Sequence, residues 1–336
     1  MPVTYENVCL HNVAEVRPTS GGVRLQRLPE EVRRQINPNG QNAALSPANC
    51  ELRFTMEGDE AQVTLSSEGQ TQLRVFQGPF DVRNPHTIGP EPTTINLTPS
   101  SFVAQLDRRW WEDQPFDPNV FRLTFGTGAP VILHEVRGDG IRPPAAEQLP
   151  AITCLTYGTS ITQGAKSEAP HLSYAAQTAW HLGADLINLG LGGSCHCEPV
   201  LADYIAGRDD WQIASLALSV NMMGFALDEF YRRVEYMVRT VAAANPQRPV
   251  ACITLYPFRR DFLEADPSLE HGGTPEQFRR ALRDAVAACD LPNLHLIEGA
   301  DLLTNIGGLS ADLLHPSDNA MIEIGRNLAA QLQPLL

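Results

Sequence analysis

The order of apolar runs changes near residue 145, and this change constrains the fold more than any other feature. From residue 148 onward, strand-like runs alternate with helical ones: strands at 152–157, 185–190, 213–220, 249–256 and 293–297, and helices near 170–182, 198–206, 227–244, 274–289 and 318–333. Five such β–α alternations predict a parallel sheet with helices on both faces. We therefore expect an α/β domain over residues 148–336, built as a three-layer, flavodoxin-like sheet.

Residues 1–147 follow a different pattern. Short runs that alternate apolar and polar side chains lie between Gly, Pro and Asn residues, at 22–25, 51–55, 62–65, 73–76, 94–97, 121–125 and 131–134. Alternation buries one face of a strand and leaves the other in water, which predicts an all-β sandwich of the jelly-roll kind. One helix is expected at 28–36. Residues 138–144 are expected to form the linker between the two domains. At least one of Trp110 and Trp111 is expected to fill the sandwich core.

Charge and composition narrow the classes of partner. The net charge of −14 and the lack of clustered basic residues disfavour a nucleic acid or an anionic membrane. No apolar run approaches the ~20 residues that span a bilayer, and the first residues lack the pattern of a signal peptide. We expect a cytoplasmic protein. Its seven scattered cysteines do not suggest a disulfide framework. Because neither a dinucleotide nor a P-loop motif occurs, no cofactor is expected.

Polar residues after three strands form a candidate site, because ligands of open parallel sheets bind outside the carboxyl ends of the strands. Ser160 follows the first strand and is the candidate nucleophile. The glycines at 190–193 follow the second and can bring backbone N–H groups close to a ligand, although a tight turn explains them equally well. Asn221 follows the third and offers two amide donors, with a turn or capping role as the alternative.

Asp312 and His315, just before the last expected helix, complete the candidate site. A carboxylate three residues before a histidine can orient the imidazole through Nδ1 and leave Nε2 free to accept a proton from a serine. Asp318 is the rival partner for His315. Its place at the start of the helix fits a cap better.

Four blocks, in this order, resemble the SGNH or GDSL serine hydrolases: Gly158-Thr159-Ser160-Ile161, the stretch 188–193, Asn221, and Asp312-Leu313-Leu314-His315-Pro316. The resemblance implies Ser160 as nucleophile, His315 as base and Asp312 as its orienting acid. It also implies an oxyanion hole made by the N–H groups of Ser160 and Gly193 with the Asn221 amide. Residues 1–147 look, more loosely, like the β-sandwich that precedes the hydrolase domain in some esterases of this family.

This sequence departs from the family pattern in two places. Thr159 replaces the usual Asp of G-D-S, and Val220 and Met222 flank Asn221 where G-x-N-D is common. The first change removes an acid that is not the proton acceptor in the family. The second leaves the floor of the pocket more apolar than usual.

The activity that the resemblance implies is that of a metal-independent serine esterase that forms an acyl-enzyme. Short acyl groups, such as acetyl on a carbohydrate or a small metabolite, are the expected substrates. Two alternatives stay open: an acyltransferase that resolves the same acyl-enzyme with an alcohol, and a non-catalytic carbohydrate-binding or scaffold protein. The oligomeric state has no signature in the sequence.

Three other features invite chemistry and are set aside. Cys195-His196-Cys197 cannot easily close a tetrahedral zinc site without a second pair of ligands. Lys166 is conceivable in a Ser-Lys dyad, but His315 is the better-placed base. His171 is expected to have a capping or surface role.

Overall fold

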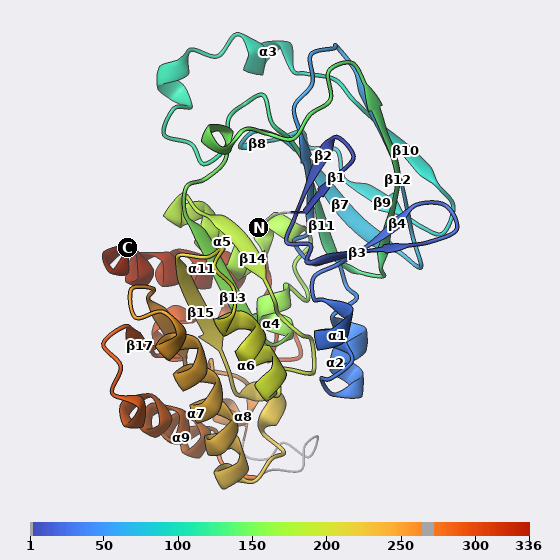
Figure 1. The fold of residues 1–336 in the computed structure, drawn as a ribbon. Helices are drawn as coiled ribbons and strands as arrows, with labels where there is room; N and C mark the ends of the chain where they lie inside the picture. Colours follow the sequence, from blue (N-terminus) through green and yellow to red (C-terminus); the bar gives the residue numbers. More distant parts are fainter. Residues whose placement is uncertain (1–2, 264–271) are drawn as a thin grey trace.

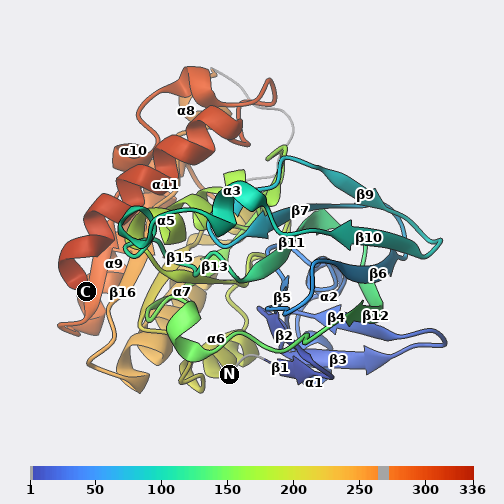
Figure 2. The same ribbon diagram turned by 90° about the horizontal axis from the view of Figure 1, so that it is seen from above.

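The protein consists of a pair of antiparallel sheets followed by a parallel sheet with its helices, and the two halves lie side by side (Figure 1 and Figure 2). The structure is a computed structural model that describes residues 3–263 and 272–336. Within these ranges, no helix has the length and apolar character needed to cross a membrane.

The first half is a β-sandwich, as predicted. Its seven-stranded sheet has the order β1-β2-β5-β11-β7-β8, with β9 also paired to β7: β1 Val3–Tyr5, β2 Val8–His11, β5 Glu51–Phe54, β7 Thr71–Gln77, β8 Phe80–Asp81, β9 His86–Ile88 and β11 Phe121–Gly128. The five-stranded sheet has the order β10-β6-β12-β4-β3: β3 Glu15–Pro18, β4 Val23–Gln26, β6 Ala61–Ser67, β10 Thr93–Leu97 and β12 Val131–Gly138. Alternating side chains such as Leu52, Val63 and Leu123 fill the core between the sheets.

The connections of this half differ from expectation in two ways. The helix predicted at 28–36 is only one turn, α1 (Glu30–Arg33), and a second helix follows, α2 (Pro38–Ala43). Asn37 separates them because its side chain caps α2, accepting the Gly40 N–H at 2.9 Å. Both helices project from the sandwich toward the other half (Figure 1).

The expectation that Trp110 or Trp111 fills the sandwich core is wrong. Trp110 is 67% exposed, and the half-buried Trp111 lies outside the apolar core. Both belong to the long connection between β10 and β11, which leaves the sheets and holds only α3 (Ser101–Ala104) and η1 (Arg108–Trp110). A further short helix, η2 (Ala146–Gln148), lies in the passage to the second half.

The second half is the predicted flavodoxin-like sheet. Its strands are all parallel, in the order β14-β13-β15-β16-β17: β13 Thr153–Gly158, β14 Asp185–Asn188, β15 Ile213–Ala217, β16 Val250–Ile253 and β17 Leu294–Ile297. Numbered along the chain, this is the order 2-1-3-4-5 of flavodoxin-like sheets. The strand order therefore reverses between β13 and β15, and ligands of such sheets bind outside the carboxyl ends of the strands at this point.

Helices cover both faces of this sheet. Apolar side chains of α6 (Pro199–Ala206), α7 (Leu227–Ala244) and α9 (Pro275–Cys289) pack on one face, and those of α5 (Tyr174–Leu182) and α11 (Asp318–Leu332) pack on the other. The helical spacing of buried residues such as Phe230, Val234 and Val241 on α7 explains this placement. Short helices complete the half: η3 Pro170–Leu172, α4 Ser160–Gln163, η4 Val220–Met222, α8 Arg259–Phe262, α10 Gly299–Leu302, η5 Ile306–Gly308 and η6 Gln333–Leu335.

Strand β14 is the edge of the parallel sheet, and side chains of the sandwich hydrogen-bond to its open backbone. The Nε2 atom of His11 lies 2.7 Å from the carbonyl oxygen of Leu186, and Asn12 donates to the carbonyl of Asn188 at 3.3 Å. An uncovered strand edge presents unpaired backbone groups. The sandwich therefore completes the edge of the sheet as well as packing against it.

A buried bidentate ion pair joins the halves at the start of the same strand. Arg53 donates to Asp185 through Nη1 at 2.6 Å and Nη2 at 2.7 Å, and its Nε bonds Glu51 at 2.7 Å. Burial alone would raise the pKa of Asp185, but Arg53 and His11 hold it below its ordinary value. Glu51 is satisfied in turn by Arg122, at 2.6 Å. The pair is thus part of a closed network of charges.

Candidate active site

Ser160 lies at the switch point of the sheet. It is the first residue of α4, directly after β13, and its half-buried side chain remains accessible. Thr159 caps the helix by accepting the N–H of Ile161 at 3.3 Å, and Gly164 ends it after one turn in the left-handed conformation, at φ 96°. The short strand and the abrupt turn together hold the hydroxyl at the carboxyl edge of the sheet.

His315 lies against Ser160 and Asp312 lies against His315. The Ser160 Oγ atom is 2.9 Å from His315 Nε2, and His315 Nδ1 is 2.8 Å from Asp312 Oδ2. A carboxylate can only accept here, which assigns the proton of the neutral ring to Nδ1 and leaves Nε2 to accept from the serine. This is the geometry in which a histidine deprotonates a serine.

The turn before α11 fixes the carboxylate. Asp312 Oδ1 accepts the backbone N–H groups of Leu314 at 3.0 Å and His315 at 2.9 Å. Burial would raise the pKa of Asp312, but these bonds and the imidazole lower it to about 2. Leu313 takes a left-handed conformation, at φ 50°, and its carbonyl accepts the Arg259 N–H at 2.7 Å. The turn is therefore tied to α8 while it presents both side chains.

Two loops bring donors to the same edge. A Cβ built on Gly192 would lie 3.6 Å from the Cβ of Ser160, so the glycine loop passes beside the serine. Gly193 is exposed at φ 67°, with open space where a side chain would stand. On the next loop, Asn221 Oδ1 accepts the Cys195 N–H at 3.1 Å. That bond assigns the carbonyl end of the amide and leaves Nδ2 as its donor end.

Residues 152–333 match the model of the GDSL-like lipase/acylhydrolase family. The chain belongs to this family. No curated protein matches the sequence.

Solved structures with the same fold include other acylhydrolase-like proteins. A salicylyl-acyltransferase from a tetracycline biosynthetic pathway aligns over 100% of this chain and 99% of its own, with a TM-score of 0.77 and 14% identity. A GDSL-like lipase from Bacteroides ovatus aligns over 97% and 95%, with a TM-score of 0.68 and 16% identity. A family two carbohydrate esterase from Clostridium thermocellum, in complex with cellohexaose, aligns over 86% and 92%, with a TM-score of 0.59 and 17% identity. At these identities the likeness concerns the fold.

Gln163 is a residue of the candidate site that the sequence did not reveal. Its Oε1 accepts the Gly192 N–H at 2.8 Å, which fixes the loop one residue before Gly193. Gly190 allows this approach, because a Cβ there would come within 2.4 Å of the Gln163 backbone nitrogen. A glutamine three residues after a serine is unremarkable in sequence, so only the fold identifies it.

The residues that sequence analysis set aside lie elsewhere. Lys166 is exposed, and Asp318 accepts the backbone N–H of Glu168 at 3.0 Å instead of contacting His315. Cys195 and Cys197 are buried in the core. In the described ranges, no group of three or more His, Cys, Asp or Glu side chains could hold a metal ion. Metal independence stays a prediction.

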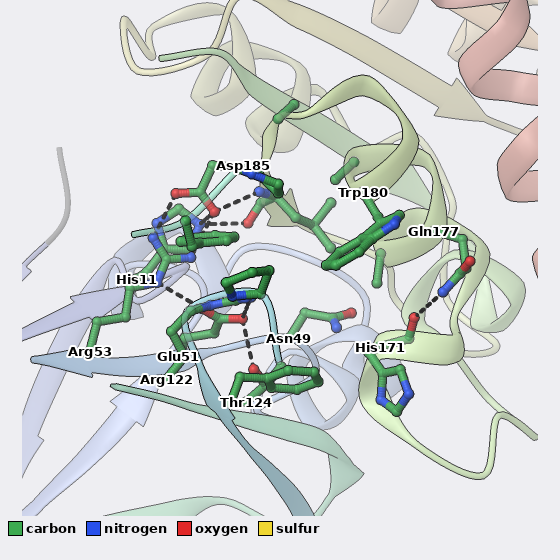
Figure 3. Close-up of a pocket in the computed structure, with 18 of the residues that line it drawn as sticks. His11, Asn49, Glu51, Arg53, Arg122, Thr124, His171, Gln177, Trp180 and Asp185 are labelled. Carbon is green, nitrogen blue, oxygen red and sulfur yellow. Dashed lines mark hydrogen bonds and ion pairs between the residues drawn. The ribbon is translucent and has the colours of Figure 1, made fainter. Parts of the chain in front are cut away.

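A cavity lined by residues of both halves lies away from the candidate triad. It has a volume of about 260 Å³ and lies between the sandwich and the α5–β14 edge (Figure 3). Trp180 forms one wall, His171 another, and the paired Arg53 and Asp185 lie in the floor. The sequence placed His171 at a cap or the surface, whereas it is half-buried here, with its ring edge-on to Phe76. The charges of the floor are satisfied by one another, so they hold the halves together.

Proposed function

We propose that this acylhydrolase is a serine esterase that works through an acyl-enzyme. Ser160 Oγ attacks the ester carbonyl carbon as His315 Nε2 takes its proton, and the negative charge moves to the carbonyl oxygen. The tetrahedral intermediate collapses, the bond to the leaving alcohol breaks, and His315 returns the proton to that alcohol. Water then attacks the acyl-serine with His315 again as base, which releases the carboxylic acid and frees Ser160.

The observation that carries this proposal is the continuous chain of hydrogen bonds from Ser160 through His315 to Asp312, at 2.9 and 2.8 Å. Asp312 stays ionised and stabilises the imidazolium that forms during each proton transfer. The N–H groups of Ser160 and Gly193 and the Asn221 amide are the proposed oxyanion donors. This chemistry needs no metal ion and no cofactor.

A small apolar cavity is lined by residues that adjoin Ser160 and His315 in the sequence. The cavity, of about 20 Å³, little more than the space of one water molecule, lies among side chains that include Ile161, Val220 and Leu314. Ile161 follows Ser160 in the sequence, and Leu314 precedes His315. We propose that this cavity receives an acetyl-sized acyl chain of a small-molecule or carbohydrate ester.

Transfer of the acyl group to an alcohol is the second candidate. The likeness in fold to a salicylyl-acyltransferase over the whole chain favours it. An acceptor alcohol would occupy the place of water in the second step, with His315 as the same base. The triad itself is compatible with either acceptor.

We also propose that the chain has two domains and that the protein is cytoplasmic. We assign residues 1–147 to an accessory domain and 148–336 to the acylhydrolase domain, since the second range contains the parallel sheet and the three triad residues. The seven cysteines are all buried and free. Free thiols are typical of the reducing cytoplasm, which is why we propose this compartment.

A chain-length series of p-nitrophenyl esters tests the substrate, after labelling with a fluorophosphonate and peptide mapping have located the reactive serine. We expect labelling at Ser160 and a kcat/KM that falls steeply from acetate to longer esters. Adding a sugar alcohol during acetate turnover separates the two candidates, because a transferase forms the acetylated sugar. No labelling at Ser160 would favour the non-catalytic alternative.

A further inference from the structure

Arg27 is a buried cation with an unusual set of partners. It follows β4, is only 1% exposed, and donates to four backbone carbonyls: to Ser46 through Nε at 2.7 Å, to Ala43 through Nη2 at 3.0 Å, and to Asn188 and Gly190 through Nη1 at 2.9 and 3.0 Å. In the described part of the chain, no carboxylate forms an ion pair with it. Two of its acceptors belong to the sandwich half, one is at the last residue of β14, and one is in the loop that follows this strand.

Burying such a charge is costly unless its donors are satisfied. Desolvation accordingly lowers the pKa of Arg27 to about 10, so the guanidinium stays protonated at neutral pH. The planar arginine guanidinium has several N–H donors and can reach acceptors on two segments at once. A lysine ammonium cannot do this with the same geometry. The side chain is therefore suited to hold two backbone segments at a fixed separation.

The segments that it holds include the loop that leads to Gly193. Gly190 O, one of the acceptors, lies three residues before Gly193, and the intervening Gly192 donates its N–H to Gln163. Gln163 in turn donates through Nε2 to Ala43 O, at 3.2 Å, which is an acceptor of Arg27 as well. The carbonyl of Ala43, in the sandwich half, thus accepts from both Gln163 of α4 and Arg27, and each of these side chains also contacts the glycine loop.

Asn37 holds the other side of the same loop. Its Nδ2 donates to the carbonyl of Ser194 at 3.2 Å and to Glu198 Oε1 at 2.6 Å, and its backbone N–H also reaches Glu198, at 3.1 Å. Gly193 lies between these contacts and those of Arg27. The segment around α1 and α2 therefore brackets the one exposed residue whose N–H is proposed to meet the oxyanion.

We propose that Arg27 is a positioning residue for the oxyanion hole, and that the sandwich half thereby belongs to the catalytic unit. It acts through the backbone of the glycine loop and does not touch the substrate. This inference rests on the proposed esterase function. It predicts that loss of the guanidinium weakens the stabilisation of the transition state and leaves substrate binding nearly unchanged.

Arg27→Met removes the donors and keeps the length of the side chain. We expect kcat for p-nitrophenyl acetate to fall about 10- to 100-fold, as for a reacting group displaced by a fraction of an ångström to an ångström. KM should change by less than about threefold, since an interaction made only in the transition state is lost. Arg27→Lys keeps the charge but cannot span both segments, and a smaller fall in kcat is expected. Arg27→Lys also provides the test if Arg27→Met does not fold.

His11→Ala is the matched control. It removes a buried contact to the same strand from the same half, at the carbonyl of Leu186, which lies before the glycine loop. Thermal unfolding and circular dichroism establish that each variant is folded at the assay temperature. The control should lower stability and leave kcat within about twofold of the wild-type value.

Unchanged kcat in both folded Arg27 variants, or an equal fall in His11→Ala, would overturn the inference and leave the esterase proposal standing. Wild-type protein that neither hydrolyses esters nor reacts with a fluorophosphonate would overturn both together. A fall in kcat confined to the Arg27 variants supports the inference.

Discussion

The Asn221 side-chain oxygen accepts the Cys195 N–H at 3.1 Å, so the third loop of the site is tied to the glycine loop by the residue proposed as an oxyanion donor. Asn221→Ala should lower kcat by roughly 10²–10³, or about 2.7–4 kcal/mol, with little change in KM, because its amide faces charge that develops only in the transition state. Steady-state kinetics on a short ester measure both. A raised KM with unchanged kcat would make Asn221 a substrate-binding residue instead.

Ser219 occupies a conformation that favours glycine, at φ 131°, and its buried hydroxyl finds no hydrogen-bond partner among the described residues. Ser219→Gly should relieve the backbone strain and remove the unpaired hydroxyl, which together outweigh the flexibility that glycine adds to the unfolded chain. We expect a gain of about 1 kcal/mol in the free energy of unfolding, measured in urea. Loss of stability would show that the hydroxyl has a partner such as bound water.

The carboxylate of Asp312 couples stability to pH in the acid range. Its pKa is lowered from 3.8 to about 2 in the folded protein, so its stabilising effect is complete above pH 4 and is lost as the pH falls toward 2. The difference in urea midpoint between the wild type and Asp312→Asn should therefore be constant from pH 5 to 7 and shrink below pH 4. A difference that persists unchanged at pH 2 would contradict the ionised state of Asp312.

Arg53 and Asp185 should make the two halves unfold together. Both are buried, and removing one partner leaves the other charge unpaired, so Arg53→Met should lower the free energy of unfolding by about 3–5 kcal/mol. The double variant Arg53→Met/Asp185→Leu should recover part of this loss. Denaturant unfolding of the wild type is expected to show one transition. Two separate transitions would mean that the halves are energetically independent.

Local patterns were sufficient to predict most of the second half. The apolar stripe of α7 and the Thr274 capping box of α9 depend only on neighbours along the chain, and both helices lie within a residue or two of their predicted bounds. Strands β1, β2, β3, β8 and β9 were missed, because strands of two to four residues are defined by their partners instead of by periodicity.

The candidate triad residues could be selected from the sequence because their blocks are short and ordered along the chain. The contacts that support the site could not be predicted from the sequence. Arg53 and Asp185 are 132 residues apart, and Arg27 and Asn188 are 161 apart. In sequence, Arg27 is one of many arginines near a turn. Only the packing of the sandwich on the edge of the parallel sheet gives these side chains their partners.

The kcat values of Ser160→Ala, His315→Ala and the double variant, measured on one short ester, test the central claim most directly. Each single variant should lose about 10⁴–10⁶ in kcat, and the double variant should be scarcely worse, because nucleophile and base act as a unit. Asp312→Asn should fall between these and the wild type. Substantial turnover in Ser160→Ala, or losses that multiply in the double variant, would contradict a Ser160–His315 mechanism.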